Sequence, residues 1–198
     1  MARLDQRFFN RKTEAVAREL LGKVLVRKIG KDKISGKIVE TEAYIGSHDL
    51  ACHASRGKTE RTSAMFKKAG IWYVYMIYGF YHCLNIVTEE KDHPSAVLIR
   101  ALEPLEGIGK MKKNRKTDEI LNLASGPGKL CQALEIDRGM NCTSAISKGA
   151  KLYIEDRKIE IPKSKIKKTK RIGVDYAGKW KDRHLRFYIK NNPFVSKI

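Results

Sequence analysis

The sequence predicts an α/β mixed (α+β) fold, with a curved, largely antiparallel sheet and helices around it. Three observations lead to this prediction. The 198 residues are enough for one good hydrophobic core and marginal for two. No internal repeat or Gly/Ser-rich linker divides the chain, so residues 1–198 are expected to form a single domain. Short apolar strand patterns, separated by turn residues, greatly outnumber the helical patterns.

The N-terminal elements are expected to be one helix and one strand pair. A helix is predicted over residues 13–21, where Thr13 can cap it and Gly22 can stop it. Strands are predicted over residues 23–28 and 34–44, on either side of the polar turn Gly30-Lys31-Asp32.

The strongest strand pattern is in residues 71–78, which are rich in aromatic and β-branched side chains. Gly79 interrupts it, and the pattern resumes over residues 81–88, which predicts a hairpin. A further apolar strand is expected over residues 96–102.

The C-terminal half is expected to continue the alternation. Helices are predicted over residues 105–114, 118–123 and 127–134, the last with Pro127 at its first position, and strands over residues 151–155, 170–174 and 185–190. The run of Lys and Arg in residues 163–171 is expected to be a solvated loop, with direct contact to phosphates as the alternative.

Charge gives the first indication of a partner. Lys and Arg total 41 against 22 Asp and Glu, a formal net charge of +19. Such an excess predicts a polyanionic partner, with nucleic acid ranked ahead of an anionic membrane surface. No apolar run approaches the roughly 20 residues that span a bilayer, and the first ten residues lack the apolar core of a signal peptide. We therefore expect no membrane association and a cytosolic or nuclear chain.

No metal or cofactor is expected. None of the cysteines lies in a C-x-x-C pair, and the five histidines do not combine with them at the spacing of a zinc site. Reduced thiols, buried or semi-buried, are therefore predicted at Cys52, Cys83, Cys131 and Cys142.

Two segments carry candidate polar chemistry. Strand alternation places Glu40, Glu42 and Tyr44 on one face, where an exposed sheet surface is the alternative to a functional site. The loop of residues 47–63 is long enough to be functional and contains His53, although a single loop histidine is usually a surface residue. The same loop carries Arg56, Lys58 and Arg61, which form a candidate set for contacting phosphates.

The predicted hairpin and the strand after it add further candidates. Tyr78, just before Gly79, can act as a wedge between bases, whereas core packing is the alternative for Tyr75 and its neighbours. Asn85 interrupts an apolar strand and needs a partner or ligand if it is buried. Arg100 ends another apolar run and needs a carboxylate, for which Glu42 is a candidate.

Together these segments resemble the alkyladenine DNA glycosylases, also called methylpurine or 3-methyladenine DNA glycosylases. The resemblance runs from about Phe9 to Ser196, and the order of many modest motifs makes it specific. The matching segments are Glu42-Ala-Tyr44, His53, residues 73–79 (Tyr-Val-Tyr-Met-Ile-Tyr-Gly), Asn85, residues 100–104 (Arg-Ala-Leu-Glu-Pro), residues 125–132 (Ser-Gly-Pro-Gly-Lys-Leu-Cys-Gln), residues 171–174 (Arg-Ile-Gly-Val) and residues 185–188 (Leu-Arg-Phe-Tyr).

The resemblance implies a repair enzyme that flips alkylated or deaminated purines out of duplex DNA and hydrolyses the N-glycosidic bond. It also implies a role for each matched residue. Glu42 would be the general base for the attacking water, with Arg100 and the main-chain carbonyl of Ile172 as further ligands of that water.

The remaining matched residues would handle the base and the DNA. Tyr44 would stack on one face of the flipped base, and His53 with Tyr75 on the other. Asn85 would exclude the exocyclic amine of normal guanine, and Tyr78 would fill the gap in the duplex. Phe80, next to the wedge, occupies a position that varies in the family. Contacts to DNA outside the base pocket are expected from Tyr78, Arg56, Lys58, Arg61 and Lys129.

This chemistry explains why one carboxylate can suffice. Base removal passes through an oxocarbenium-like state, and glycosidases usually supply both an acid and a second carboxylate. An alkylated purine such as 3-methyladenine is already cationic, so it can leave without the acid, and it stacks well on tyrosine. Arg100 beside Glu42 would keep that carboxylate ionised. Hypoxanthine, 7-methylguanine and ethenoadenine are the other candidate lesions.

Other classes of protein make different predictions. A non-enzymatic RNA- or DNA-binding protein would need no pocket and no Glu42–Arg100 pair. A zinc nucleobase deaminase needs an H-x-E…P-C-x-x-C signature, which the sequence lacks. A bifunctional glycosylase needs a nucleophilic lysine, and no lysine occupies a matched pocket position. We therefore expect a monomeric, monofunctional enzyme acting on double-stranded DNA, in the bacterial nucleoid or in a eukaryotic nucleus.

Overall fold

A sheet of nine strands forms the centre of the protein in the computed structural model, which describes residues 2–196. Every strand pairing in it is antiparallel. The strands are β1 (Ala2–Arg3), β2 (Val24–Ile29), β3 (Asp32–Ile45), β4 (Trp72–Ile77), β5 (Tyr81–Thr88), β6 (Ser95–Glu106), β7 (Leu152–Asp156), β8 (Ile166–Thr169) and β9 (Arg186–Ile189). The α-helices of the described part are α1 (Gln6–Phe9), α2 (Thr13–Glu19), α3 (Ile108–Arg115) and α4 (Pro127–Ala133).

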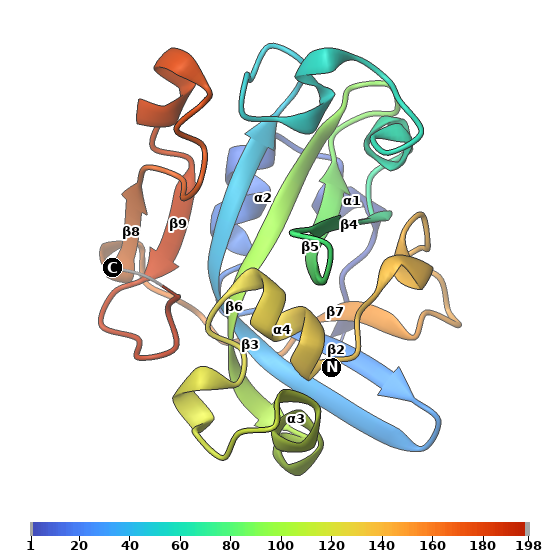
Figure 1. Cartoon of the computed structure of the whole chain (residues 1–198), viewed down its shortest axis with the longest axis vertical. Coiled ribbons are helices and arrows are strands. Elements are labelled where there is room, and N and C mark those ends of the chain that lie inside the picture. Colours follow the sequence, from blue (N-terminus) through green and yellow to red (C-terminus); the bar gives the residue numbers. More distant parts are fainter. Residues whose placement is uncertain (1, 197–198) are drawn as a thin grey trace.

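Two long strands, β3 and β6, organise the sheet and cross most of the molecule in Figure 1. The main strand order is β1-β7-β2-β3-β6-β5-β4, while β9 pairs with both β3 and β8. The first half of β3 pairs with β2, whereas Glu40, Thr41 and Glu42 pair with β9. Irregular register between β3 and β6 surrounds Glu40, and such bulges bend a sheet. The bend separates a structural half from the half that carries the candidate site residues.

The helices cover the sheet, with α4 drawn in front of it and α2 behind it in Figure 1. The core between these elements contains Phe9, Leu20, Ile38, Trp72 and Ile99, all fully buried. The Thr41 hydroxyl donates to the Ala17 carbonyl at 2.8 Å, which ties α2 directly to β3. This packing fixes the strand on which Glu42 and Tyr44 lie.

Most of the predicted elements are confirmed. The structure contains the α+β fold, the helix that begins at Thr13, the helix that begins at Pro127, and strands within or overlapping the predicted ranges 23–28, 34–44, 71–78, 81–88, 96–102, 151–155 and 185–190. The predicted cap is wrong, however, because Thr13 is the first residue of α2 and its hydroxyl bonds to Thr88 and Glu89 instead of to the helix. The β4–β5 hairpin is also present, with Ile77 opposite Tyr81 at its end. All four cysteines are free; Cys52, Cys83 and Cys131 are buried as predicted, whereas Cys142 is exposed.

Two of the predicted helices need correction. Residues 105 and 106 continue β6, because Glu106 pairs with Ser35 on β3, and the helix begins only at Ile108 after Gly107 turns the chain with φ of 74°. Residues 118–123 form one 3-10 turn, Ile120–Asn122, instead of an α-helix. Ile120 and Leu121 remain exposed, so this segment has no buried apolar stripe to stabilise a longer helix.

Two predictions near the C-terminus are also wrong. Residues 170–174 are irregular, not a strand, because the Ile172 N–H donates to the Glu42 carboxylate and Arg171 turns inward to Asp49. The basic run 163–171 is not simply a loop, since it contains β8, which pairs with β9. Lys167 and Lys168 on that strand are nevertheless exposed, so the expectation of solvated side chains is correct.

Candidate functional site

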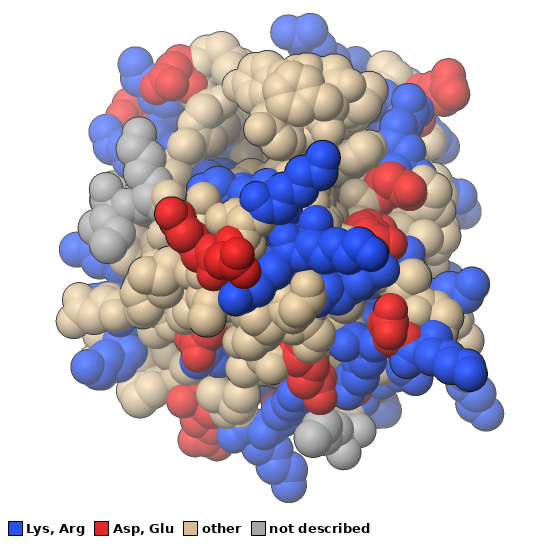
Figure 2. Space-filling model, turned by 60° about the horizontal axis from the view of Figure 1, so that its bottom comes forward, with Lys and Arg blue, Asp and Glu red and all other residues tan. Residues whose placement is uncertain are grey.

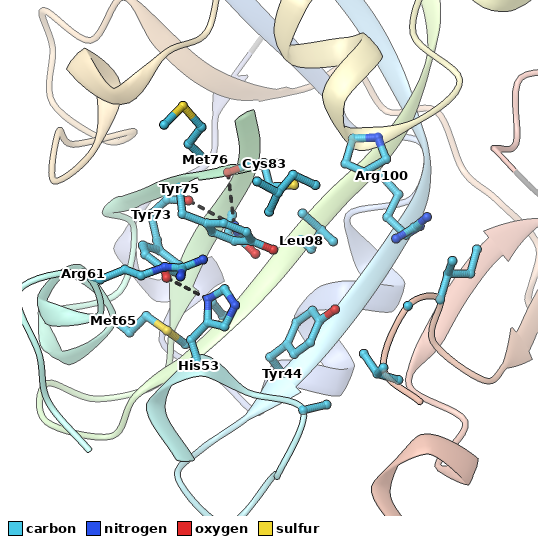
Figure 3. A pocket seen from close by; sticks show the side chains of 18 of the residues that line it. Tyr44, His53, Arg61, Met65, Tyr73, Tyr75, Met76, Cys83, Leu98 and Arg100 are labelled. Atoms are coloured by element: carbon cyan, nitrogen blue, oxygen red, sulfur yellow. Dashed lines mark hydrogen bonds between the residues drawn. The ribbon is translucent and has the colours of Figure 1, made fainter. Parts of the chain in front are cut away.

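A cavity of about 580 Å³ lies where the second half of β3 faces the β4–β5 hairpin. Strands β3, β4, β5 and β6, the 3-10 helix His53–Arg56 and the segment after β8 all contribute to its wall. Figure 3 shows side chains from these separate segments pointing toward one space. The residues predicted from sequence that line it are Tyr44, His53, Arg61, Tyr75, Tyr78, Asn85, Arg100 and Ile172.

Glu42 lies directly behind this wall, with its side chain fully buried. Its Oε2 accepts a hydrogen bond from the Tyr44 hydroxyl at 2.9 Å and lies 3.3 Å from Arg100 Nη1. Its Oε1 accepts the backbone N–H of Ile172 at 2.8 Å. Because each carboxylate oxygen can accept two hydrogen bonds, Oε1 retains one acceptor position. The prediction that Glu42 and Arg100 are partners is thus confirmed by the geometry.

Arg100 is shared between two buried carboxylates. Its Nε donates to Glu40 Oε1 at 3.0 Å while Nη1 faces Glu42. Burial alone would lower the pKa of Arg100, but Glu42 and Glu40 outweigh that effect and the pKa is raised. Glu40 is also held by Arg186 Nε at 2.7 Å and by the Ser196 N–H at 2.8 Å. Arg100 is therefore a fixed cation beside Glu42.

A second buried ion pair supports the Ile172 segment. Arg171 makes two hydrogen bonds to Asp49 and a third, at 2.9 Å, to the Ala43 carbonyl. Its guanidinium carbon also lies 4.8 Å from the centre of the Tyr44 ring. Because the Arg171 side chain is fully buried and does not line the cavity, it contacts Tyr44 from outside the pocket. The pair thereby joins the end of β3 to the segment that contacts Glu42.

Aromatic rings form two sides of the cavity. Tyr44 stands on β3, and His53 packs edge-on against Tyr75 with their ring centres 4.5 Å apart. Burial is the main cause that raises the pKa of both Tyr44 and Tyr75 well above 10, so both rings carry neutral hydroxyl groups. The pocket thus presents flat apolar faces with polar edges, which suits a planar aromatic ligand.

His53 is held in its neutral form. Burial, followed by the charges of Arg61 and Arg56, lowers its pKa from 6.5 to about 4. Its Nδ1 lies 2.8 Å from the Tyr73 hydroxyl, and burial raises the pKa of Tyr73 to about 12. A neutral imidazole has one donor and one acceptor nitrogen, so its remaining nitrogen can bind one edge group of a ligand.

Asn85 is 3 % exposed and lines the same cavity. Its amide nitrogen donates to the Tyr73 carbonyl at 3.1 Å and to the Cys83 carbonyl at 3.4 Å. These two contacts fix the side chain on the pocket wall and give the buried amide the partners that it needs.

The hairpin tip beside the pocket is strongly exposed. Tyr78 is 81 % exposed and Phe80 66 %, and both Tyr78 and Gly79 have positive φ. Gly79 adopts this backbone conformation without strain, and the turn holds the Tyr78 ring out from the surface. Core packing, the alternative for this tyrosine, is therefore wrong for Tyr78.

The chain is similar along nearly its whole length to proteins of one known family. The family model for methylpurine-DNA glycosylase matches residues 7–193. The chain belongs to the methylpurine-DNA glycosylase family. A protein of Clostridium perfringens (strain 13 / Type A) is 52% identical over 98% of this chain and 99% of its own length. One from Methanocella arvoryzae is 52% identical over 98% and 96%, and one from Legionella pneumophila (strain Lens) is 47% identical over the whole of both chains. All three bear names that assign them, provisionally, as 3-methyladenine DNA glycosylases.

Not all of the Lys and Arg side chains that were predicted to contact DNA outside the base pocket lie there in this glycosylase. Lys58 and Arg56 are exposed on the loop before β4, and Arg56 lines a neighbouring cavity. Arg61 instead reaches the wall of the main pocket (Figure 3). Lys129 on α4 bonds to the side chain of Asn122 and does not line the pocket. Figure 2 shows many further Lys and Arg side chains on one face, interspersed with acidic ones.

Sequence reasoning missed several residues of the glycosylase site. Tyr73 shares a strand face with Tyr75, and this spacing could have revealed it. The pairing of Asp49 with Arg171 spans 122 positions and has no local signal. Arg61 was identified only as a contact for phosphates, because a loop's sequence does not show which side chains turn inward.

Within residues 2–196 no group of His, Cys, Asp and Glu side chains is arranged to hold a metal ion. None of the helices in this part of the glycosylase is both long and apolar enough to cross a membrane.

Proposed function

We propose that this glycosylase removes alkylated or deaminated purines from double-stranded DNA by base flipping and hydrolysis. One observation carries the proposal: a buried carboxylate, Glu42, lies behind the wall of an aromatic cavity and is held by Arg100, Tyr44 and the Ile172 N–H. The lesions considered are 3-methyladenine, 7-methylguanine, hypoxanthine and ethenoadenine. The proposed product is an abasic site.

Base recognition follows from the aromatic walls. A flipped purine would stack with Tyr44 on one side and with His53 and Tyr75 on the other, since these rings come from opposite segments of the cavity. Extrusion of a base costs a few kcal/mol, and less for damaged pairs. The exposed Tyr78 would offset part of this cost by filling the gap left in the duplex.

Hydrolysis is assigned to Glu42. The unused acceptor position on Oε1 would bind the attacking water and take its proton as the C1′–N bond breaks. The water oxygen becomes bonded to C1′, and the bond's electron pair leaves with the purine. A cationic purine departs as the neutral base, whereas a neutral purine such as hypoxanthine departs as an anion that takes up a proton from solvent. Negative charge on Glu42 would also stabilise the developing oxocarbenium ion, while Arg100 keeps the carboxylate ionised and oriented.

Glu42→Gln tests the assignment of the base. This variant should bind hypoxanthine-containing duplex as wild type does, but should lose nearly all single-turnover formation of abasic sites. Glu19→Gln, a change in an exposed carboxylate on α2, is the matched control and should cleave normally. Excision by the Glu42→Gln variant at more than about a tenth of the wild-type rate would remove Glu42 from this role.

The absence of lyase activity is proposed because no lysine lines the described cavity. Borohydride should therefore trap no covalent protein–DNA adduct during excision, and EDTA should leave the rate unchanged. A trapped adduct would identify a Schiff-base mechanism. Gel filtration of the complex should show one protein per lesion duplex if the enzyme acts as a monomer.

A further inference from the structure

Arg61 is a cation built into the pocket, although it comes from a loop whose cations were assigned to phosphates. It lines the main cavity together with His53 and Tyr75. Its guanidinium carbon lies 5.3 Å from the centre of the Tyr75 ring, within the range of a cation–π contact. Figure 3 shows the side chain extending into the group formed by Tyr73, Tyr75 and His53.

Two arginines beside the pocket, Arg100 and Arg171, are neutralised by carboxylates, whereas Arg61 is not. Arg100 is paired with Glu40 and Glu42, and Arg171 is paired with Asp49. Across residues 2–196 no ion pair joins Arg61 to a carboxylate. A positive charge that no carboxylate neutralises therefore lies at the wall of the cavity on the Tyr75 side, although the residue is also exposed to solvent.

The pKa of His53 shows the effect of the Arg61 charge. Its imidazole faces the same cavity, and its pKa is lowered to about 4 by burial, then by Arg61 and then by Arg56. An imidazolium ring is a planar aromatic cation, as is an N-methylated purine. Burial and the charge of Arg61 disfavour the cationic form of His53 in this cavity. The same two effects would disfavour a cationic purine bound there.

We propose that Arg61 sets lesion preference by disfavouring cationic purines, so that neutral lesions such as hypoxanthine are excised in preference to cationic ones such as 7-methylguanine. The proposal rests on the proposed function of the pocket. The negative face of Tyr75 is already in contact with one cation, and a second cation stacked in the pocket would be repelled by the first. A neutral purine retains its stacking on Tyr75 and avoids this repulsion.

Arg61→Gln is the test. Single-turnover excision of 7-methylguanine and of hypoxanthine is measured in the same duplex sequence, and the ratio of the two rates should rise by about tenfold, the equivalent of one pKa unit. Arg61→Lys retains the charge and should keep a ratio near that of wild type. Lys58→Gln removes a cation from the same loop, outside the cavity lining, and should also leave the ratio unchanged.

A second measurement does not depend on catalysis. The pKa of His53, followed by NMR, should rise in Arg61→Gln and stay low in Arg61→Lys. Because Arg61 is exposed, neither change removes buried packing. A His53 pKa that does not move in Arg61→Gln would overturn the electrostatic argument.

The outcomes separate this proposal from the function on which it rests. An unchanged excision ratio in Arg61→Gln overturns the role of Arg61. An equal loss for both substrates, with a shallower salt dependence of binding, would make Arg61 a phosphate contact and would also overturn it. If wild type excises neither substrate, the proposed function itself fails.

Discussion

Arg171 and Asp49 form a bidentate ion pair in which neither side chain is exposed, with Nη1 2.5 Å from Oδ2 and Nη2 2.8 Å from Oδ1. The same carboxylate accepts the N–H groups of Ile45 and Ala51. The pair thus joins the end of β3, the start of the His53 loop and the segment that contacts Glu42. These three segments supply much of the pocket, although they are distant in sequence.

Removing one partner of this pair should be strongly destabilising. Asp49→Asn leaves the Arg171 charge buried without compensation, which costs about 3–5 kcal/mol in comparable cases. Urea unfolding at neutral pH measures the loss in the free energy of unfolding. The exposed pair Lys168–Glu14 provides the control, because Lys168→Gln should cost less than about 1 kcal/mol. Equal costs for the two variants would contradict a special role for the buried pair.

The lowered pKa of His53 predicts how stability depends on pH. The folded-state pKa, about 4, lies below the ordinary value of 6.5, so the unfolded chain binds the proton more tightly. This contribution to stability is complete above pH 6.5 and is lost as the pH falls from 6.5 through 4. The shift corresponds to at most about 3 kcal/mol, and less because the ring is partly exposed. Wild type should therefore lose more stability than His53→Gln between pH 7 and pH 4. Parallel stability curves for the two proteins would show that His53 does not titrate in this way.

Asn85→Ser should separate selection from catalysis. If a flipped purine binds as proposed, the shorter side chain should open space beside its edge, where guanine carries an exocyclic amine, without changing Glu42 or Arg100. We expect faster release of guanine from a G·T mispair, with excision of hypoxanthine from a hypoxanthine·T pair largely retained. The lost contacts to the Tyr73 and Cys83 carbonyls should also reduce stability by about 1 kcal/mol. If both substrates slow equally and the melting temperature drops, Asn85 has only a structural role.

Binding to DNA should depend steeply on salt. With a net charge of +19, the protein should release counterions from the phosphates it neutralises. The logarithm of the association constant should then fall linearly with the logarithm of salt, at about −0.9 per neutralised phosphate. The measurement uses undamaged duplex, so that excision does not interfere. A flat dependence would show that the basic surface is not the main source of affinity.

Local chemistry made much of the fold and site predictable. Pro127 marks the start of α4 because its fixed φ suits the first turn of a helix, a property that depends on neighbouring residues only. The β4–β5 hairpin follows from branched and aromatic residues on each side of Gly79. Glu42 and Tyr44 share a strand face because side chains alternate along a strand. These patterns involve residues that are close in the sequence, so they predict structure without information on distant segments.

Contacts between distant segments determined what the sequence did not predict. Residues 170–174 carry a strand-like pattern, yet the Ile172 N–H bonds to Glu42, 130 positions earlier, and no strand forms. Arg61 lies in a polar loop, yet it turns toward Tyr75 inside the pocket. The sequence by itself determined the secondary structure around Glu42 and the family, because these depend on short-range patterns and ordered motifs. Only the tertiary structure decided which charges are paired, which are buried and which face the cavity, because each depends on a partner brought close by folding.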